Sequence, residues 1–352
     1  MSLEKNFTRS LKMSGLKNLK LKTLKYKINY LEPETEILDQ AAQIINHGGL
    51  VAFPTETVYG LGADALNGEA VKKIYDAKGR PSNNPLILHI NNLNQAEDLV
   101  YLDDRAYSLM REFWPGPITF VLKAKDIIPL ETRGGLDTAA LRMPDNKIAY
   151  KLIEAAGTPI AAPSANISGR PSPTDFNAVR QDMDGRIDMI LYSDNDLNKN
   201  IGIESTVIDI SDEQPLLLRA GGTSKELIDK FLLKNFNVKL ERPDEQSKRR
   251  SPGTRYRHYA PLIPVKICYF KDNNFIDLKD NSEWGFIGLH EPKKIFKKVL
   301  IFNSLESYAK GLFKAFREFE ADGLQGIIAE LPDDETGVGL GLRDRILRAS
   351  AL

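Results

Sequence analysis

The chain has 352 residues, of which 42% are hydrophobic, so it is long enough for two domains with separate cores. Lys and Arg together number 48, as do Asp and Glu, which excludes a global positive field that would draw the protein to nucleic acid. The single cysteine, Cys268, excludes a disulfide framework and a multi-cysteine metal site, and no apolar run approaches the roughly 20 residues that span a bilayer. We therefore expect a cytoplasmic protein that makes no membrane contact and binds no metal through its own ligands.

Residues 1–33 differ in composition from the rest of the chain. Lys and Arg dominate up to Lys27, Glu4 is the only acid among them, and leucines are interleaved. Charge runs of this kind are usually solvated, so we expect a basic, disordered arm. The alternatives are an organelle-targeting peptide and a translation start at Met13; the segment lacks the continuous apolar core of a secretory signal.

Regular structure is predicted from Thr35 onward. Apolar residues recur at helical spacing between residues 37 and 45, which predicts a helix. Residues 50–53 form a short apolar strand that ends at Pro54. A second amphipathic helix is predicted between Asp103 and Pro115.

The segment from Lys78 to Leu86 carries two cations, Lys78 and Arg80, followed by two prolines and two asparagines. Its prolines exclude a helix, and its stiffness and cationic charge suit the binding of a phosphate chain. The alternative is a solvated basic turn. An apolar strand follows at residues 86–90.

Several apolar strands end in polar loops. Because ligands of α/β sheets bind where strands end, we predict one shared pocket that is rich in cationic and hydroxyl groups. The alternative is that prolines and polar residues simply terminate each strand. The predicted strands cover residues 50–53, 138–143, 160–162 and 216–218.

Four polar residues of the predicted strands need a partner or a function. His89 shares a strand face with Ile87, where a structural role is the alternative to a catalytic one. Arg142 lies in an apolar strand, so its partner is either an internal acid or a bound phosphate. Ser205 and Thr206, early in a strand predicted at residues 203–210, indicate either a ligand or cross-strand hydrogen bonds.

Residues 243–261 read as a linker, and strand–helix alternation after it predicts a small α/β domain. The glycine-rich segment from Gly337 to Gly341 lacks the spacing of a dinucleotide-binding loop, and we interpret it as a close-packing turn. No P-loop, nucleophile elbow or Cys–His pairing is present. An enzyme with this sequence would therefore work by cationic positioning.

The chain contains, in this order, the motifs FPTETVYGL from Phe53, KGRP from Lys78, WPGP from Trp114, PSANISG from Pro163 and ESTVID from Glu204. Their order and spacing resemble those of the YrdC-like domain family across residues 34–223. The Tyr256–Pro261 segment resembles the linker of the long form of the threonylcarbamoyl-AMP synthase family, and Gly339 to Ser350 resembles the end of its additional domain. The predicted organisation is a basic arm at 1–33, a catalytic domain at 34–223, a linker with a lid segment at 224–261, and a C-terminal domain at 262–352.

This resemblance implies a fold and an activity. The fold is a curved mixed sheet with helices around a concave cavity, followed by a smaller Rossmann-like α/β domain. The activity is that of a nucleotidyltransferase, which forms L-threonylcarbamoyladenylate and pyrophosphate from L-threonine, bicarbonate and ATP. Mg²⁺ accompanies ATP, and a tRNA threonylcarbamoyl transferase complex then modifies adenosine 37 of tRNA.

The resemblance also implies roles for individual residues. Lys78 and Arg80 are the predicted catalytic residues. The predicted ATP-binding residues are Arg80, Asn84, Ala162, Ser164, Asn166, Ser172, Arg219 and Tyr256, the last as part of a lid. The predicted threonine-binding residues are Thr57, His89, Thr138, Arg142 and Ser205.

One departure from the family pattern lies at residues 193–200, where a glycine pair is expected and only Gly202 remains. Two other functions compete with the synthase. An RNA-binding module could use the basic cavity, with weak RNA contact, but zero net charge disfavours it. A hydrogenase-maturation carbamoyltransferase is disfavoured by the single cysteine.

Overall fold

The computed structural model describes residues 22–193, 201–250, 258–270 and 282–351. Within these residues the larger domain contains a ten-stranded mixed sheet in the order β1-β8-β2-β3-β7-β4-β6-β5-β9-β10. The strands are β1 (Leu24–Lys27), β2 (Val51–Phe53), β3 (Gly60–Asp64), β4 (Ile87–His89), β5 (Ile118–Lys123), β6 (Thr138–Arg142), β7 (Ile160–Ala161), β8 (Met189–Tyr192), β9 (Thr206–Asp209) and β10 (Leu216–Arg219).

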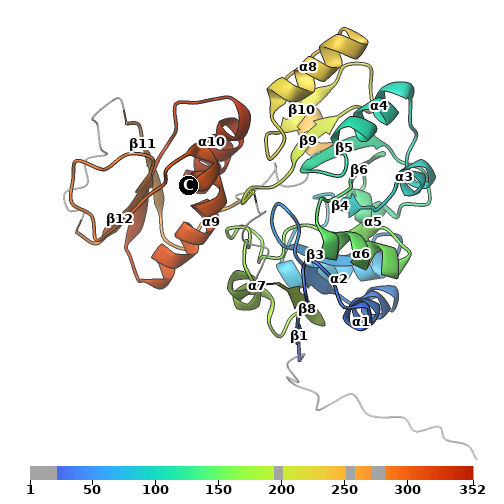
Figure 1. Ribbon diagram of the computed structural model, residues 1–352, viewed down its shortest axis with the longest axis horizontal. Helices are drawn as coiled ribbons and strands as arrows, with labels where there is room; N and C mark the ends of the chain where they lie inside the picture. Colours follow the sequence, from blue (N-terminus) through green and yellow to red (C-terminus); the bar gives the residue numbers. More distant parts are fainter. Residues whose placement is uncertain (1–21, 194–200, 251–257, 271–281, 352) are drawn as a thin grey trace, which may run out of the picture.

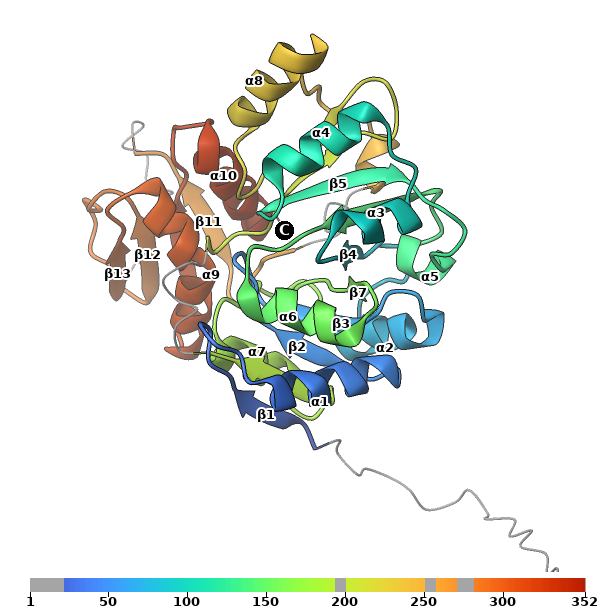
Figure 2. The ribbon, with the colours of Figure 1, turned by 45° about the vertical axis from the view of Figure 1, so that its right-hand side comes forward.

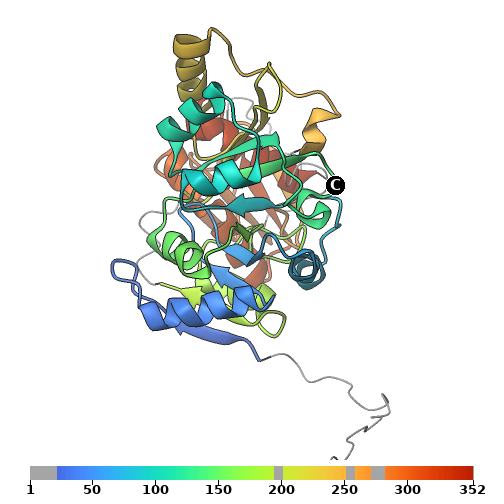
Figure 3. The same cartoon turned by 90° about the vertical axis from the view of Figure 1, so that its right-hand side faces the viewer.

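Helices of the larger domain lie around this sheet, with α1 and α8 at opposite ends of the domain (Figure 3). The predicted helix near Thr35 is confirmed, since α1 buries Leu38, Ala41, Ala42 and Ile45. The helices are α1 (Thr35–Asn46), α2 (Gly68–Lys78), α3 (Leu93–Leu99), α4 (Asp104–Phe113), α5 (Leu130–Arg133), α6 (Lys147–Ala156), α7 (Phe176–Met183) and α8 (Lys225–Phe236), followed by the 3₁₀ helix η2 (Ser247–Arg250).

The smaller domain has a four-stranded sheet in the order β11-β14-β12-β13, and all its strand pairs are parallel. Two helices cover the face of this sheet that is turned towards the larger domain (Figures 1 and 2). The predicted class, a large mixed sheet followed by a smaller α/β domain, is confirmed. The elements are β11 (Val265–Cys268), β12 (Trp284–Gly288), β13 (Lys298–Ile301), α9 (Leu305–Ala321), β14 (Gly326–Glu330) and α10 (Gly337–Ser350).

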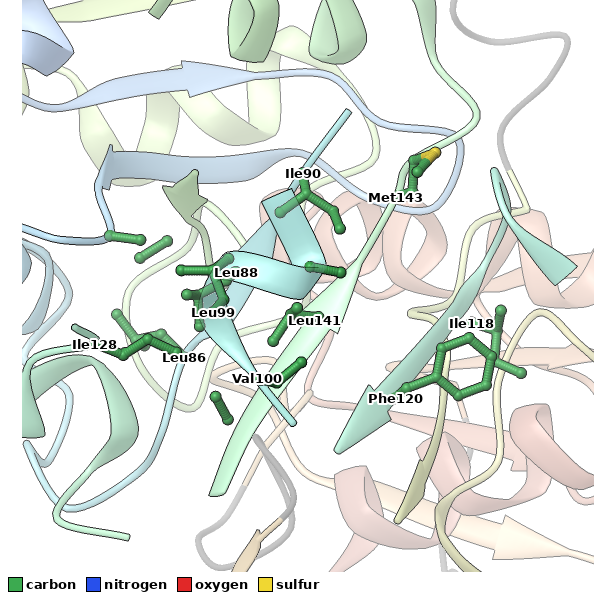
Figure 4. Close-up of a cluster of buried hydrophobic side chains, with 14 of the residues drawn as sticks. Leu86, Leu88, Ile90, Leu99, Val100, Ile118, Phe120, Ile128, Leu141 and Met143 are labelled. Carbon is green, nitrogen blue, oxygen red and sulfur yellow. The ribbon is translucent and has the colours of Figure 1, made fainter. Parts of the chain in front are cut away.

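The predicted alternation around β4 is confirmed and explains how this strand serves two surfaces. Leu86, Leu88 and Ile90 are buried in the main hydrophobic core, where they lie near Leu141 (Figure 4). Each such side chain contributes roughly 1.5–3 kcal/mol to stability by its burial. His89, on the opposite face with Ile87, is thereby directed away from this core.

The expectation of a disordered arm through residue 33 is wrong for residues 22–33. Strand β1 pairs in parallel with β8, and Leu24 stands opposite Met189. The reason is an alternation that the basic residues obscure: Ile28 and Tyr30 are buried in a core cluster with α1. The remainder of the predicted arm, residues 1–21, lies outside the described residues.

The interpretation of residues 337–341 as a turn is also wrong, because α10 begins at Gly337. The close packing predicted there is real. A Cβ on Gly341 would lie 2.8 Å from Cδ1 of Ile203 and 3.3 Å from Cα of Gly221. Ile203 and Val58 of the larger domain belong to the same hydrophobic cluster as the helices of the smaller domain. The two domains therefore share a core.

Candidate active site

One cavity lies beside the ends of β4, β6 and β7 and beside the loop that leads into β9. Its empty volume is about 590 Å³, including the part open to solvent. The predicted shared pocket is thus present, and it unites most of the polar strand ends that the sequence indicated. Among the residues that line it are eight of the predicted site residues: Thr57, Arg80, His89, Arg142, Ala162, Ser164, Ser205 and Arg219.

Arg80 is placed in this cavity by the turn that ends α2. Gly79 adopts a left-handed conformation with φ of 61°, and the Arg80 amide donates to the Tyr75 carbonyl at 2.9 Å. The guanidinium then donates to the carbonyl oxygen of Pro85 at 3.0 Å. Asn84, by contrast, is fully buried and does not line the cavity. The turn therefore presents one of its two cations.

Lys78, the other cation, lies behind the cavity wall with 2% of its surface exposed. Its Nζ donates to the carbonyl oxygen of Asn166 at 2.6 Å and to that of Ser164. Burial, and next the charge of Arg80, lower the pKa of Lys78 well below its ordinary value. In this geometry Lys78 joins the end of α2 to the loop after β7.

The loop after β7 contains four predicted ATP-binding residues, of which Ala162 and Ser164 line the cavity. Asn166 shapes the loop: its Nδ2 donates to the carbonyls of Ile167 and Arg170, and its Oδ1 accepts from Ser164 Oγ at 2.5 Å. Ser172 Oγ donates to Oε1 of Glu204 at 2.5 Å. These two side chains order the cavity wall from behind.

Arg142 has the internal acid that was one of its two predicted partners. Its Nη2 lies 2.7 Å from Oε1 of Glu56, and both side chains are buried. Nη1 donates to Oγ1 of Thr57 at 2.9 Å. The Glu56 carboxylate compensates the buried arginine charge and fixes the side chain at the cavity.

His89 lines the cavity beside Arg142 and is 3% exposed. Burial, and then the charge of Arg142, lower the pKa of His89 to about 3. The imidazole is therefore neutral at physiological pH. A neutral ring can donate or accept a hydrogen bond to a ligand without adding charge.

Ser205 and Arg219 form a second polar wall. Arg219 donates through Nε and Nη2 to the carbonyl oxygen of Ser205, at 3.1 and 2.9 Å, and through Nη2 to its Oγ at 3.1 Å. The Ser205 hydroxyl also lies 2.8 Å from Oγ1 of Thr119 on β5. Cross-strand hydrogen bonding, one of the two predicted explanations, is thus present. The strand begins at Thr206, later than predicted.

The lining residues that were not predicted as site residues include Glu204, His258 and Tyr259. Burial, and then the charges of Arg80 and Lys78, lower the pKa of His258 to about 3. Tyr259 is 4% exposed and adopts a positive φ of 70°, unusual for a tyrosine. His258 and Tyr259 lie inside the Tyr256–Pro261 motif of the linker, and their aromatic side chains were the signal in the sequence that could have indicated a place in the site.

Besides Lys78, Asn84, Asn166 and Ser172, two further predicted residues are not placed in the cavity. Thr138 is buried at the first position of β6, about 13 Å along the strand from Arg142, and it does not line the cavity. Thr138 and Arg142 share one face of β6, but they lie at opposite ends of the strand, and only the end with Arg142 meets the cavity. Tyr256 lies outside the described residues, as do residues 194–200 of the altered loop.

The described residues contain no group of three or more His, Cys, Asp or Glu side chains that could hold a metal ion. In the same part of the chain, no helix is both long and apolar enough to cross a membrane.

Comparison with known proteins agrees with this architecture. The family model described as "Telomere recombination", which covers Sua5, YciO and YrdC, matches residues 43–221. The model described as "Threonylcarbamoyl-AMP synthase, C-terminal domain" matches residues 223–351. The chain is thus a Sua5/YciO/YrdC-type domain followed by a second domain of a defined kind.

Relatives share both domains. A threonylcarbamoyl-AMP synthase of Bacillus subtilis is 43% identical over 88% of this chain and 92% of its own length. One from Pyrococcus abyssi is 42% identical over 88% and 93%. The crystal structure of P. abyssi Sua5 complexed with L-threonine superimposes with a TM-score of 0.83 and 39% identity, covering 93% of this chain and 98% of that one. The chain belongs to the threonylcarbamoyl-AMP synthase family.

Proposed function

We propose that this protein forms L-threonylcarbamoyladenylate and pyrophosphate from L-threonine, bicarbonate and ATP. The observation that carries the proposal is the convergence of Arg80, Arg142 and Arg219 on one cavity that also presents a neutral His89 and several hydroxyls. Three guanidinium groups suit two anionic substrates, a triphosphate and a carboxylate.

The ATP side of the cavity is assigned to Arg80, Ala162, Ser164 and Arg219. Arg80 and Ser164 belong to neighbouring loops that Lys78 holds together. Lys78, Asn84, Asn166 and Ser172 support these loops from behind, so the role of Lys78 is to position Arg80 and Ser164. This assignment modifies the predicted direct catalytic role of Lys78.

The threonine side is assigned to Thr57, His89, Arg142 and Ser205. Arg142, held by Glu56 and Thr57, can pair with a carboxylate through its guanidinium. His89 and the hydroxyls can bind the polar groups of an amino acid without adding charge. The threonine-bound P. abyssi relative supports this substrate for the family.

The chemistry requires no protein nucleophile. The threonine amine attacks CO₂ with loss of a proton, or bicarbonate with loss of water, and becomes a carbamate. A carbamate oxygen then attacks the α-phosphorus of ATP, the bond from that phosphorus to the bridging oxygen breaks, and pyrophosphate leaves. The protein holds the two anions together and compensates their charge. Mg²⁺, bound by the phosphates, would neutralise charge on the pyrophosphate leaving group. Glu56 and Glu204 are each paired with an arginine, which suits a Mg²⁺ that enters with ATP.

The product is an activated threonylcarbamoyl group. We propose that a tRNA threonylcarbamoyl transferase complex consumes it to modify adenosine 37 of tRNA. The comparisons offer no support for the alternative RNA-binding module.

The test measures pyrophosphate release by the full chain with ATP, L-threonine, bicarbonate and Mg²⁺, omitting each component in turn. We expect release only when all are present, and the adenylate should be detected by mass spectrometry. No release with the complete mixture would overturn the proposal. Arg80→Ala should abolish release with unchanged circular dichroism, while Arg111→Ala, at an exposed position of α4, should leave it intact.

A further inference from the structure

A buried arginine of the smaller domain reaches the wall of the cavity. Arg345 on α10 has 0% of its surface exposed. Its Nε lies 2.8 Å from Oε2 of Glu204, and its Nη1 donates to the carbonyl oxygen of Ala220 at 2.9 Å. Glu204 itself lines the cavity. Only the side chain of Glu204 therefore separates the charge of Arg345, a residue of the C-terminal domain, from the cavity.

Glycines explain how α10 comes this close. Gly341 precedes Arg345 by one helical turn and packs against Ile203 and Gly221, where a Cβ would not fit. Added Cβ atoms would likewise collide with the backbone of Glu204 at Gly221 and with the backbone of Lys310 at Gly202. Glycine is the residue that permits such an approach of backbones. The glycine-rich start of α10 therefore serves to deliver Arg345.

The pair of Arg345 and Glu204 lies where several cavity segments meet. Glu204 accepts the hydroxyl of Ser172 from the loop after β7. The guanidinium of Arg345 lies 5.2 Å from the ring centre of Tyr259 in the linker, a cation–π contact. Loss of Arg345 would therefore remove a contact to the linker and disturb the carboxylate that holds the loop after β7.

Electrostatics gives the pair a specific task. Burial by itself raises the pKa of Glu204, but the charges of Arg345 and Arg219 outweigh burial and hold that pKa below its ordinary value. Glu204 is thus an ionised carboxylate in a cavity that is otherwise cationic. Without its partner, this carboxylate would repel a polyphosphate and compete with it for Arg219.

We propose that Arg345 is a positioning residue of the reaction, by which the C-terminal domain neutralises and orients Glu204 so that the cavity accepts the triphosphate of ATP. Arg345 acts through Glu204 and does not touch the substrates. The inference rests on the proposed function, because ATP is the polyanion it concerns.

A double-mutant cycle on the full chain tests this role. Arg345→Gln should raise the KM for ATP at least about tenfold, a change of about 1.4 kcal/mol, and the KM for threonine less than about threefold. Adding Glu204→Gln removes the uncompensated charge. The Glu204→Gln/Arg345→Gln protein should therefore return to within about threefold of the wild-type KM for ATP.

A purely structural role predicts different results. Arg345→Gln would then change both KM values equally or neither, and the second substitution would bring no recovery; either result overturns the inference. If Arg345→Gln does not fold, the double variant decides, and a KM for ATP more than about tenfold above wild type in that protein overturns it. If neither variant folds, Arg345→Lys, which retains the charge, is measured instead, and a KM for ATP more than about tenfold above wild type in that protein overturns the inference.

Two controls separate this inference from the proposed function. Arg343→Gln alters an arginine on the same helix that pairs with the exposed Glu335, and its kinetic constants should equal those of wild type. Calorimetric titration of wild type, Arg345→Gln and the double variant with ATP requires no turnover. Absence of pyrophosphate release by wild type would overturn the proposed function, whereas equal ATP affinity in wild type and Arg345→Gln would overturn the role of Arg345.

Discussion

Nζ of Lys78 donates a hydrogen bond of 2.6 Å to the carbonyl oxygen of Asn166, and the Ser164 carbonyl accepts a second one. A lysine at the end of one helix thus supports a loop that follows a strand of the central sheet. This relationship makes Lys78 a structural link between the turn that presents Arg80 and the loop that presents Ser164.

The first prediction concerns this link. Lys78→Met keeps the length of the side chain but leaves two buried carbonyls without their donor. We expect the free energy of unfolding to fall by about 2–4 kcal/mol and turnover to fall roughly 100-fold, because both loops lose their alignment. Urea denaturation and pyrophosphate release measure the two effects.

Lys72→Met is the matched control on the same helix. Lys72 is half-exposed and pairs with Glu69 and Glu131 in solvent, so its loss should lower the free energy of unfolding far less than Lys78→Met does. If Lys78→Met were as stable as wild type but inactive, Lys78 would act on the substrates directly, as the sequence suggested.

Local patterns predicted much of the site because its residues lie at strand ends. The alternation around His89, the arginine inside β6 and the polar segments after prolines each indicated one wall of the cavity. Their convergence follows from the sheet, in which β4 pairs with both β6 and β7. A strand face does not define which end of the strand meets the cavity: Thr138 shares a face with Arg142, but it lies at the other end of β6 and does not line the cavity.

The remaining features depend on tertiary packing. Glu204 and Arg345 are 141 positions apart, and only the docking of α10 on the larger domain brings them together. The inward direction of Lys78 depends on how α2 ends. The strand at residues 24–27 was hidden because two of its exposed positions, Lys25 and Lys27, are basic, and only the buried Ile28 and Tyr30 beyond it indicate packing.

A second prediction concerns acid stability. His89 and His258 have a pKa of about 3 in the folded protein, below the ordinary value of 6.5. The unfolded chain therefore binds more protons than the folded protein between these values. The stability that comes from keeping these two histidines neutral is fully present above pH 6.5. It is lost as pH falls towards 3, by up to about 1.4 kcal/mol per pH unit for each histidine.

Urea denaturation between about pH 7 and about pH 4 measures this dependence. Paired carboxylates also contribute to the pH dependence of stability. The contribution of one histidine is therefore obtained by comparing the pH profile of the free energy of unfolding between wild type and a variant. His89→Gln should flatten the profile by about one proton. Identical profiles for wild type and His89→Gln would contradict the assignment of a neutral, buried His89.

A third prediction separates the two substrates. Arg142 contacts both Glu56 and Thr57, and a lysine cannot make both contacts with the same geometry. Arg142→Lys should raise the KM for threonine about tenfold and that for ATP less than about threefold. Arg80→Lys should show the reverse preference. Steady-state pyrophosphate release with each substrate varied in turn measures both, and the same preference in both variants would contradict the assigned sides of the cavity.

The last prediction concerns the contact between the domains. Alanine is a better helix former than glycine by about 1 kcal/mol, so Gly341→Ala would stabilise an isolated helix. In this protein the added methyl group would lie 2.8 Å from Ile203 and close to the Gly221 backbone, which cannot easily move. We expect a net loss of about 1–3 kcal/mol in the free energy of unfolding, together with a raised KM for ATP, since Arg345 is displaced with the helix.

Gly68→Ala in α2 is the control, because its Cβ would meet only the partly exposed Glu131 side chain, which can move away. Urea denaturation of both variants should show destabilisation by Gly341→Ala alone, and equal stabilities would mean that α10 can shift without cost.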